Sequence, residues 1–411
     1  MASACETTNR HERNATGRRT RVLFVAHSAL LGGAELCLDT TLANLDQARF
    51  EPFVLFAGDG PLVARARHYG CHVDVWPLSW WLCFEQGWWH YKNLLLGSAP
   101  RIVRLASFLR QHEIDLVYTN TAVVFEGALA ARRAGVPHVW HVHEVLSPDH
   151  MRPRLLPLKT IAGLIDKLSQ RVIFESESSR RIAAGWIGTE KSLAIPNSVR
   201  LRPPAEPDLA AARRRLGLPQ GATVFTFLGR FSERKNPLLF AEALSRLPSD
   251  CGALGLFVGE GPLAGELAAR LATLNLGERT SVLPFQADVS DVLSASDIVV
   301  LPSNEESFGL VLVEAAAFAK PVVATRTEGP AEIVVDGVTG LLVAPRDIEG
   351  LTQALLQLLE DSARRVCMGR AAAQRAAKLF SAEGNTRRIE QTLSDVLGVR
   401  RAAGSAEVRA T

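Results

Sequence analysis

Two glutamates eight positions apart, Glu306 and Glu314, are the residues of this sequence best spaced for ligand chemistry. The apolar run at 297–301 ends at a proline and predicts a short strand, and the apolar run from Leu310 to Phe318 predicts a buried helix. Glu306 would then lie at the carboxyl end of a strand, beside the free amides of a helix N-terminus, where anions bind. The two acids, about 12 Å apart over two helical turns, could hold a sugar at Glu306 and a ribose at Glu314. Two solvated surface acids are the alternative interpretation.

The loop at 229–237 carries the best basic candidates, Arg230 and Lys235. It follows a predicted strand at 224–229 and leads into a predicted helix. Both side chains could reach a diphosphate, the arginine through its planar guanidinium and the lysine as a point charge. A solvated basic loop is the alternative.

The N-terminal half contributes two further candidates. Gly32 and Gly33 follow the first predicted strand and begin a helix, so they could let the backbone approach a phosphate closely, or form a plain turn. His143 follows the apolar strand at 138–142 and could bind a sugar hydroxyl, with a structural histidine as the alternative. His141 and His143 on alternate positions resemble a metal-binding pair. The sequence offers no third ligand and no Asp-x-Asp motif, so we predict no metal site.

The sequence at 258–264 matches the Gly-x-Gly-x-x-Ala form of a dinucleotide-binding loop. The next predicted strand, at 281–284, ends in Phe285 and Gln286 rather than in the acid that would bind a ribose. We therefore interpret 258–264 as a structural tight turn.

Tryptophan is concentrated in one segment of the chain. Five of the seven tryptophans lie between Trp76 and Trp89, and a segment of mixed basic and apolar residues follows at 151–159. Core packing explains some of these rings. Stacking on an acceptor sugar, or contact of both segments with an anionic membrane surface, are the alternatives.

Predicted strands and helices alternate from Val22 to Val343, which indicates an α/β protein with parallel sheets covered on both faces. The predicted strands are 22–26, 52–57, 72–76, 115–119, 138–142, 171–175, 193–196, 224–229, 255–259, 281–284, 297–301, 321–325 and 340–343. A proline-rich linker at 199–207 separates two doubly wound, Rossmann-like domains, which we expect to face each other across a cleft. The predicted segments are a disordered terminus at 1–20, domains at 21–198 and 208–380, a C-terminal helix at 381–399 and a disordered tail at 400–411.

The composition excludes several classes of protein. With 47% hydrophobic and 22% charged residues the chain is typical of a globular protein, and a net charge of +3 does not argue for nucleic acid as a partner. The six cysteines form no Cys-x-x-Cys pair, which favours reduced thiols. No secretory signal or membrane span is evident, so we expect a cytoplasmic location, with peripheral contact at the inner face of the cell membrane left open.

Taken together, these motifs resemble those of the retaining nucleotide-sugar glycosyltransferases of family 4, which have the two-domain GT-B fold. The resemblance covers about residues 21 to 388. The motifs that carry it are Gly32-Gly33-Ala34-Glu35, His143-Glu144, the segment 195–199, Gly229-Arg230 with Lys235, the segment 258–262, Glu306 with Glu314, and the segment 336–343. The sequence departs from the family pattern at Glu144, where Asp is common, and at Thr327-Glu328-Gly329, where a Gly-Gly pair is common.

The resemblance implies a role for each candidate. Arg230 and Lys235 would neutralise the donor diphosphate, and Glu306 would bind hydroxyls of the donor sugar. Glu314 would bind the ribose. Around the sugar and phosphate, the resemblance implies backbone contacts from Ser307, Phe308, Gly309 and Leu310. In the first domain it places His143 near O6 of the sugar, and Gly32 and Gly33 near the donor phosphate.

The function that follows from the resemblance is retaining transfer of a hexose from a nucleoside diphosphate sugar, most simply a UDP- or GDP-sugar, to an acceptor hydroxyl. No metal or other cofactor is expected. The expected acceptor is a glycan or lipid-linked glycan, in polysaccharide, lipid-linked glycan or glycolipid biosynthesis. A nucleotide-sugar epimerase of related fold and a non-catalytic sugar-nucleotide-binding protein are the alternatives.

Overall fold

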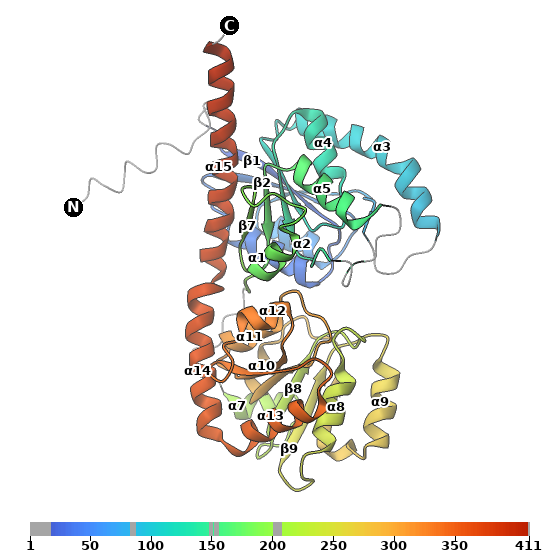
Figure 1. Ribbon diagram of the computed structural model, residues 1–411, viewed down its shortest axis with the longest axis vertical. Helices are drawn as coiled ribbons and strands as arrows, with labels where there is room; N and C mark the ends of the chain where they lie inside the picture. The colour runs from blue at the N-terminus through green and yellow to red at the C-terminus, as the bar shows by residue number, and fades with distance from the viewer. Residues whose placement is uncertain (1–17, 83–87, 148–150, 152–155, 200–207, 410–411) are drawn as a thin grey trace, which may run out of the picture. The chain divides into compact units, whose positions relative to one another are not determined.

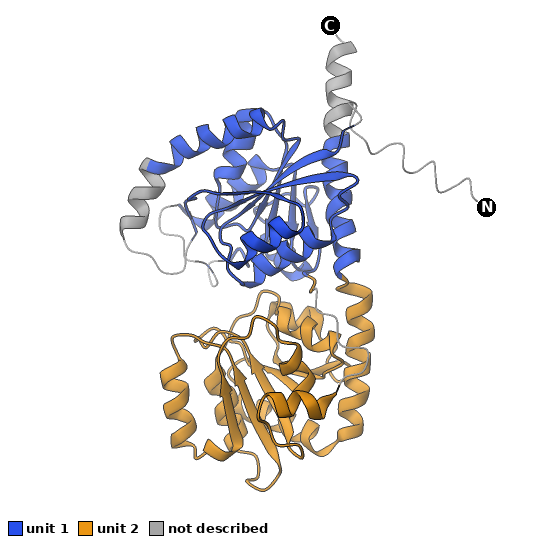
Figure 2. Ribbon diagram, turned by 180° about the vertical axis from the view of Figure 1, so that it is seen from behind, with its two compact units in different colours: residues 1–197, 382–411 blue, residues 198–381 orange. Residues whose placement is uncertain are grey.

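The computed structural model describes residues 18–82, 88–147, 151, 156–199 and 208–409, and the side chains of all of these except 88–96 and 399–409. The chain forms two compact units (Figure 2). Unit 1 comprises Met1–Asn197 and Ala382–Thr411, and unit 2 comprises Ser198–Ser381. The predicted linker at 199–207 lies, except for its first residue, outside the described residues.

Unit 1 contains a seven-stranded parallel sheet in the order β3-β2-β1-β4-β5-β6-β7 (Figure 1). The strands are β1 (Thr20–Ala26), β2 (Phe50–Phe56), β3 (His72–Val75), β4 (Leu116–Asn120), β5 (His138–Val142), β6 (Arg171–Phe174) and β7 (Ser192–Ala194). The helices are α1 (Gly33–Asn44), α2 (Pro61–His68), α3 (Trp88–Gln111), α4 (Glu126–Ala134), α5 (Leu158–Leu168), α6 (Glu177–Ala183) and α15 (Ala382–Arg409). The chain builds outward from β1 to β3 and then returns to β4 beside β1, so β1 and β4 flank a topological switch point.

Unit 2 contains a six-stranded parallel sheet in the order β10-β9-β8-β11-β12-β13. The strands are β8 (Thr223–Leu228), β9 (Ala253–Val258), β10 (Thr280–Leu283), β11 (Ile298–Leu301), β12 (Val322–Thr325) and β13 (Gly340–Val343). The helices are α7 (Leu209–Arg215), α8 (Pro237–Ser245), α9 (Ala264–Thr273), a 3-10 turn (Gly277–Arg279), α10 (Ser290–Ala295), α11 (Leu310–Ala317), α12 (Glu328–Ile333), α13 (Ile348–Glu360) and α14 (Ser362–Leu379). Here the switch point lies between β8 and β11.

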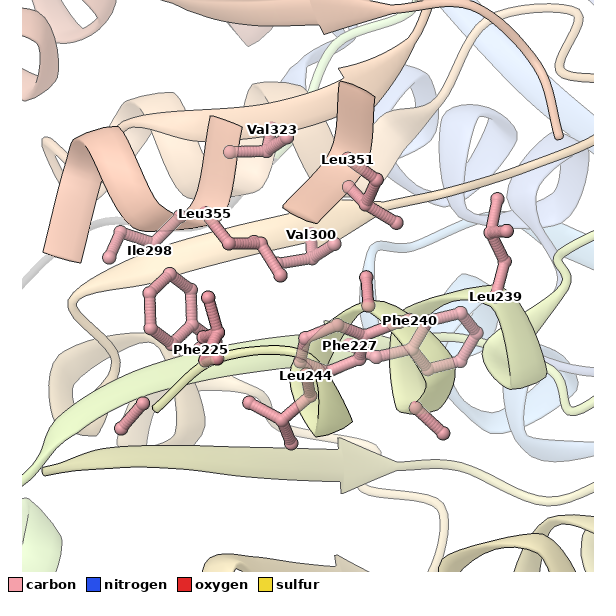
Figure 3. Close-up of a cluster of buried hydrophobic side chains, with 14 of the residues drawn as sticks. Phe225, Phe227, Leu239, Phe240, Leu244, Ile298, Val300, Val323, Leu351 and Leu355 are labelled. Atoms are coloured by element: carbon pink, nitrogen blue, oxygen red, sulfur yellow. The ribbon is translucent and has the colours of Figure 1, made fainter. Parts of the chain in front are cut away.

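The strands are apolar because helices cover both faces of each sheet. In unit 2, Phe225 and Phe227 of β8 pack with Phe240 of α8, Val300 of β11 and Leu355 of α13 (Figure 3). All five side chains are buried. This packing holds the carboxyl ends of β8 and β11 in place, which is where the candidate residues of the basic loop and the acidic motif follow.

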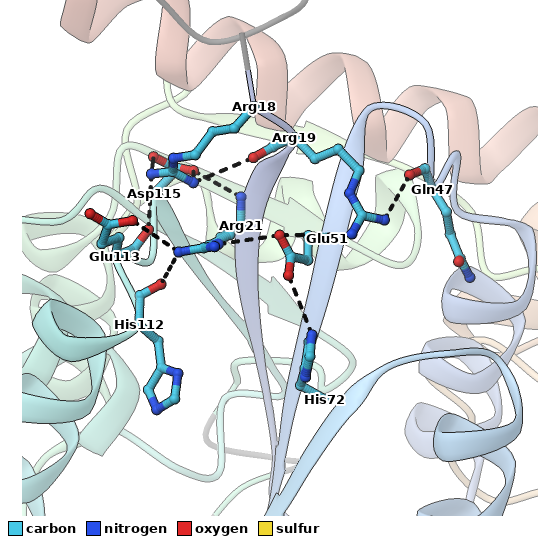
Figure 4. Close-up of polar contacts among 9 residues, drawn as sticks. All are labelled: Arg18, Arg19, Arg21, Gln47, Glu51, His72, His112, Glu113 and Asp115. Atoms are coloured by element: carbon cyan, nitrogen blue, oxygen red, sulfur yellow. Dashed lines mark hydrogen bonds and ion pairs between the residues drawn. The ribbon is translucent and has the colours of Figure 1, made fainter. Parts of the chain in front are cut away.

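Ion pairs connect residues at the amino-terminal ends of neighbouring strands in the unit 1 sheet (Figure 4). Arg18 pairs with Asp115 at 3.0 Å, and Arg21 pairs with Glu51 at 3.2 Å. Residues 18–20 are therefore ordered, and Thr20 begins β1, although the sequence placed them in a disordered terminus. The physical reason is that Asp115, just before β4, supplies a carboxylate that the local sequence around Arg18 does not reveal.

The C-terminal helix packs on unit 1. Ile389, Leu393 and Val396 of α15 belong to the same buried cluster as Val22 and Phe24 of β1. The helix continues to Arg409, beyond the boundary at residue 399 that the sequence predicted, and so occupies most of the expected disordered tail. All thirteen predicted strands are confirmed, each within two residues at either end. Among the described helices, none is both long enough and apolar enough to cross a membrane.

Candidate functional site

The switch point of unit 2 brings together the two charged motifs of the sequence. Lys235 follows β8 and Glu306 follows β11, and these strands are neighbours in the sheet. Lys235 donates through Nζ to Oε2 of Glu306. Clefts at the carboxyl ends of strands on either side of a switch point are where open α/β sheets bind ligands. The pairing of residues 71 positions apart in sequence therefore lies where a ligand site is expected.

Glu306 is a buried anion held by donors and cations. Its residue is 4% exposed. Ser303 Oγ lies 3.3 Å from the same Oε2, and Arg234 approaches Oε1 at 3.7 Å. Burial alone would raise the pKa of Glu306, but Lys235 and Arg234 more than offset burial, and the pKa lies below its usual value. Glu306 is thus ionised at neutral pH, and it can accept hydrogen bonds from ligand hydroxyls.

Backbone and amide hydrogen bonds tie the two loops to each other. The amide of Asn304 donates to the carbonyl of Arg234 at 2.8 Å, and its Nδ2 donates to the carbonyl of Glu233 at 2.7 Å. Asn236, which is the N-cap of α8, donates to Oδ1 of Asn304 at 3.1 Å and accepts from the amide of Leu239. The loop carrying Lys235 is therefore fixed against the loop carrying Glu306.

The glycine-rich segment after β9 supports the basic loop from one side. Gly259 and Gly261 have positive φ values of 146° and 156°, and a Cβ at either position would overlap the carbonyl oxygen of Gly229 or Phe231. The amide of Phe231 donates to the carbonyl of Glu260 at 2.8 Å. The glycines are needed for this close approach of two backbones. This supports a structural role for 258–264.

The acidic motif has the local structure that the sequence predicted. Gly309, in a left-handed conformation with φ of 94°, is the N-cap of α11. Phe308 is buried in the core against α14, so only its backbone is available to a ligand. Glu314 is half-buried on α11, and burial raises its pKa to about 7, although Lys235 opposes this shift. Lys235 is thus electrostatically coupled to both acids.

The segment 327–329, which departs from the Gly-Gly pattern common in the family, keeps the one glycine that the fold needs, Gly329. Gly329 donates through its amide to the carbonyl of Glu306 at 3.0 Å. A Cβ at Gly329 would overlap the backbone of Phe308. Glu328 instead of glycine at the preceding position is compatible with this packing, since Glu328 begins α12.

Arg230 is a cation at the same switch point of unit 2. Its side chain is exposed, and within the described part of the chain it makes no hydrogen bond or ion pair. It follows β8 by two residues, at the same edge of the sheet as Lys235. A guanidinium without an internal partner at this edge is available to an anionic ligand.

The switch point of unit 1 gathers a second polar group of residues. Gly32 is the N-cap of α1, and Gly33 is the first residue of that helix. The next carbonyl, that of Ala34, accepts from Nδ2 of Asn120 at 2.9 Å. Oδ1 of Asn120 lies 3.0 Å from Nε2 of His143. The loop after β1, the end of β4 and the residue after β5 are therefore connected by one asparagine.

His143 is buried and neutral. Burial lowers its pKa to about 4, although the carboxylates of Glu144 and Glu35 oppose the shift. Its Nδ1 lies 3.8 Å from Oε2 of Glu175. The Glu144 carboxylate accepts from the hydroxyl of Thr121 and from the amide of Ala122 at 3.0 Å, so it ties the loop after β5 to the loop after β4.

Comparison with known families decides the assignment. The family model described as Glycosyl transferases group 1 matches residues 209–375, and the model described as Glycosyltransferase Family 4 matches residues 31–202. The UDP-Gal:alpha-D-GlcNAc-diphosphoundecaprenol alpha-1,3-galactosyltransferase of Escherichia coli is 30% identical over 278 residues, which cover 65% of this chain and 72% of that protein. The chain belongs to glycosyltransferase family 4.

Other relatives agree with this assignment. The D-inositol 3-phosphate glycosyltransferase of Mycobacterium marinum is 32% identical over 80% of this chain and 64% of its own length. The structure of Anabaena HepE in complex with UDP-glucose matches 92% of this chain and all of its own, with 27% identity and a TM-score of 0.78. The sucrose-phosphate synthase of Thermosynechococcus elongatus, 20% identical over 93% of this chain and all of its own, has the same fold with a TM-score of 0.73. The predicted GT-B fold class is confirmed.

Sequence reasoning assigned no individual role to several polar residues of this glycosyltransferase, of which it named Glu35 and Asn197 only as members of motifs. In unit 1 they are His27, Glu35, Asn120, Glu175 and Asn197, and in unit 2 they are Ser303 and Arg234. All but Glu35 and Arg234 lie at or within three residues after the end of an apolar strand. That position is a signal that can be read from sequence, but only the fold reveals which of these strand ends are neighbours.

The tryptophan-rich segment of the glycosyltransferase contributes to the core of unit 1. Trp76 packs edge-on against α3. Trp81 stacks on the tryptophan of β5 and donates to a loop carbonyl at 2.6 Å. These two half-buried rings favour core packing over contact with an acceptor or a membrane. The side chains of Trp88 and Trp89, and the basic residues within 152–155, lie outside the described residues.

His141 and His143 do not form a metal site with other residues of the described chain. Their rings lie 4.0 Å apart, centroid to centroid, and Nδ1 of His141 is hydrogen-bonded to the Tyr118 hydroxyl. Among the residues that the structure describes, no group of three or more His, Cys, Asp or Glu side chains is arranged to hold a metal ion.

Proposed function

We propose that this glycosyltransferase moves a hexosyl group from a UDP-sugar to a hydroxyl of a lipid-linked glycan, with retention of the anomeric configuration. The observation that carries the proposal is the Lys235–Glu306 pair at the switch point of unit 2, beside the unpaired Arg230. Uridine is favoured because HepE was solved with UDP and UDP-glucose, and because the Escherichia coli relative is named for UDP-Gal.

In this proposal the cations of unit 2 bind the donor diphosphate. Lys235 has three N–H donors and uses one on Glu306, so two remain for phosphate oxygens. Arg230 supplies a planar fork suited to a phosphate. The amides at the start of α11 add partial positive charge, since Gly309 opens the helix in front of them. Glu306 accepts hydrogen bonds from hydroxyls of the donor sugar, and Glu314 accepts those of the ribose.

The transfer step follows from these roles. The bond between the anomeric carbon and the β-phosphate oxygen breaks, and a bond to the acceptor oxygen forms on the same face of the sugar. The acceptor proton passes to the departing diphosphate. Lys235 and Arg230 stabilise the charge that develops on the diphosphate, and one such donor typically contributes about 10²–10³ in rate. With these cations present, the proposal requires no divalent metal.

The same proposal gives the residues of unit 1 the roles that the family resemblance implies. The backbone at Gly32 and Gly33 approaches a phosphate at the start of α1. His143, held neutral by burial, hydrogen-bonds a sugar hydroxyl. A lipid-linked acceptor is favoured because the Escherichia coli relative is named for a diphosphoundecaprenol-linked sugar. Peripheral contact with the inner face of the cell membrane would bring the enzyme to such an acceptor.

Thermal shift of the purified protein with UDP-, GDP- and ADP-sugars, in the presence of EDTA, tests the donor site. A ligand at 100 times its Kd stabilises by about 2.7 kcal/mol. We expect a response to UDP-sugars that Arg230→Ala abolishes. No response to any of the three classes, with or without added magnesium, would contradict the donor site.

Turnover distinguishes the remaining functions. Incubation with the donor alone should release UDP slowly and form no new nucleotide sugar, whereas an epimerase would convert the donor without an acceptor. Binding without turnover on any lipid-linked acceptor would favour a non-catalytic sugar-nucleotide-binding protein. Sedimentation with anionic liposomes tests the membrane contact, and an enzyme that stays in the supernatant would contradict it.

A further inference from the structure

The loop after β4 in unit 1 begins with a residue in a strained backbone conformation, Thr121. Its φ is 117°, which glycine adopts readily and which is a genuine outlier for a β-branched residue. Thr121 follows Asn120, the last residue of β4 and the register partner of Ala26 at the end of β1. The strained residue therefore lies at the switch point of this sheet. Strained backbone persists only where the surrounding structure holds it, and it is concentrated at functional sites.

Hydrogen bonds hold every polar group of Thr121, which is completely buried. Its amide donates to the carbonyl of His141 at 2.7 Å, and its carbonyl accepts from Nε1 of Trp140 at 2.7 Å. Its hydroxyl donates to Oε1 of Glu144 and accepts from the amide of Val123 at 3.2 Å. The strained turn, residues 121–124, is therefore held by β5 and by the loop that follows β5.

The Glu144 carboxylate makes most of the contacts from that loop. Oε1 accepts from the Thr121 hydroxyl, and Oε2 accepts from the amides of Ala122 and His143, each at 3.0 Å. The chain has glutamate here where aspartate is common in the family, and the extra methylene extends the carboxylate toward the neighbouring loop. These three hydrogen bonds offset part of the cost of the strained conformation.

The strained turn holds the start of the tryptophan-rich segment in place. Trp81 donates through its backbone amide to the carbonyl of Val123 at 3.1 Å, and through Nε1 to the carbonyl of Ala122 at 2.6 Å. Trp80 forms an antiparallel bridge with Val124. An ordinary φ at the first residue of the turn would send the chain after β4 in another direction. These pairings therefore depend on the strained conformation.

Trp80 is the ring of this segment that lies at the switch point. Its centroid is 5.4 Å from that of His27, which follows the last residue of β1. Trp80 also packs against the buried cluster that contains Val124, and yet it is only half-buried. Trp76 and Trp81, by contrast, pack against α3 and β5. An indole that is partly open at a switch point can make apolar contact with a ligand.

We propose that Trp80 binds a sugar ring of the acceptor, and that Glu144 and Thr121 are positioning residues that hold it at the switch point of unit 1. The proposal rests on the glycosyltransferase function proposed above. A hexopyranose has an apolar face of C–H groups beside its hydroxyls, and the part of the indole that His27 and the core leave uncovered suits such a face. The contact lies within unit 1 and involves no bond-breaking step.

Exchange of indole N–H groups tests the positioning role without any ligand. In full-length protein labelled with ¹⁵N-tryptophan, the Nε1–H groups of Trp81 and Trp140 report on the turn, because both donate to its carbonyls. Glu144→Ala should speed their exchange by about 10-fold or more, because the strained turn loses the contacts that offset its cost. Glu144→Gln should keep slow exchange, because its amide can accept from Ala122 and donate to the hydroxyl oxygen of Thr121.

A second substitution tests the strain itself. Glycine adopts positive φ readily, so adding Thr121→Gly to Glu144→Ala should make exchange slower than in Glu144→Ala alone. Without strain, Thr121→Gly would only remove further hydrogen bonds and speed exchange. Wild-type exchange in Glu144→Ala, or exchange in the double variant at least as fast as in Glu144→Ala, would overturn the positioning role.

Acceptor kinetics test the contact made by Trp80. The probe is α-D-GlcNAc-diphosphoundecaprenol, the lipid-linked acceptor in the name of the Escherichia coli relative, with UDP-Gal as donor. Trp80→Ala should raise the KM for this acceptor by about 3-fold to 10-fold and change the KM for the donor by less than about 2-fold. Glu144→Ala should raise the acceptor KM in the same way, and Glu144→Gln should not. Trp76→Ala, which removes a ring of the same segment packed on α3, is the matched control and should leave the ratio of the two KM values unchanged.

An unchanged acceptor KM in Trp80→Ala, or an equal rise in Trp76→Ala, would overturn the contact. If Trp80→Ala does not fold, Trp80→Leu keeps the packing against the core and carries the same expectation. A wild type that does not transfer to the lipid-linked probe would contradict the proposed function rather than this contact. In that case a titration with methyl α-N-acetylglucosaminide should shift the indole signal of Trp80 and not that of Trp76, and no shift at Trp80 would contradict the contact.

Discussion

Replacing Lys235 by alanine should destabilise unit 2 as well as abolish turnover. Lys235 is the contact partner of Glu306, whose side chain is 5% exposed. A contact pair of unit charges at an effective dielectric of about 20 is worth about 4 kcal/mol. Removing one partner of a buried pair typically costs about 3–5 kcal/mol, because the other charge is left buried.

The remaining neighbours of Glu306 place the expected cost at the lower end of that range. Ser303 Oγ still lies 3.3 Å from the carboxylate. Arg234, at 3.7 Å, has a side chain that is 51% exposed, and such exposed pairs contribute under about 1 kcal/mol. We therefore expect a cost of about 3 kcal/mol at pH 7.5.

The free-energy cost of Lys235→Ala should become smaller as the pH is lowered. Wild-type Glu306 has a lowered pKa, so the pair contributes stability above the usual glutamate pKa and loses it as pH falls through the lowered value. In Lys235→Ala the burial of Glu306 is offset only by Arg234 and Ser303, so the pKa of Glu306 rises. The protonated acid needs no cation, and the difference between variant and wild type should shrink toward pH 4.5. Adding Glu306→Gln should remove most of the difference at all pH values.

Hydrogen exchange is the appropriate assay, because unit 2 contains no tryptophan or tyrosine whose fluorescence could report on its unfolding. All seven tryptophans and all three tyrosines belong to unit 1, so intrinsic fluorescence reports on unit 1 alone. Amides of β8, β11 and α11 report on unit 2. A loss of about 3 kcal/mol should speed their exchange by about 100-fold, since each 1.4 kcal/mol is tenfold. The fluorescence transition of unit 1 should not move. Unchanged exchange in Lys235→Ala, or an equal change in the Glu306→Gln background, would refute the reasoning.

Three further predictions concern the same unit. The affinity for a UDP-sugar should rise as the pH rises through about 7, because the Glu314 carboxylate must ionise to accept both ribose hydroxyls, and the phosphates of the ligand do not titrate in this range. Calorimetry should show this rise for the wild type and not for Glu314→Gln. A wild-type affinity that does not depend on pH would contradict the role of Glu314. Gly329→Ala should lower the free energy of unfolding by about 1–3 kcal/mol and lower turnover, because the new Cβ would overlap the backbone of Phe308. Gly265→Ala on α9 is the control: its Cβ would meet nothing within 4 Å, so thermal unfolding should show a neutral or stabilising effect. Arg230→Ala should lower kcat/KM by about 10²–10³ with unchanged hydrogen exchange, because Arg230 has no ion pair within the described structure, and a folded variant with wild-type turnover would count against the donor site.

The glycine-rich segment illustrates what local pattern can and cannot reveal. The sequence at 258–264 matches a nucleotide-binding loop, and only the missing acid after the next strand argues against that role. The structure supplies the physical reason for the glycines, since Gly259 and Gly261 allow the backbone of Gly229 and Phe231 to approach closely. The same local pattern thus serves to position Arg230 and Lys235.

The acidic motif was predictable because its determinants are adjacent in sequence. The strand before Glu306 and the helix that begins after Gly309 are both encoded by continuous apolar runs. The raised pKa of Glu314 and the lowered pKa of Glu306 were not predictable, because they depend on burial and on Lys235. Direct contact with Lys235 and the further partners Arg234 and Ser303 lower the pKa of Glu306 below its usual value, whereas Glu314 has only a weaker opposing effect from Lys235.

By itself the sequence determined the thirteen strands, the two parallel-sheet domains and the charged motifs, because apolar periodicity, proline and glycine breaks and short motifs are local properties of the chain. The tertiary structure alone decided which strand ends are neighbours. Lys235 meets Glu306 across 71 positions, and Asn120 meets Ala34 across 86 and His143 across 23. These contacts exist because each sheet changes its direction of growth at β1–β4 or β8–β11, and that choice depends on the packing of whole layers rather than on any local run of residues.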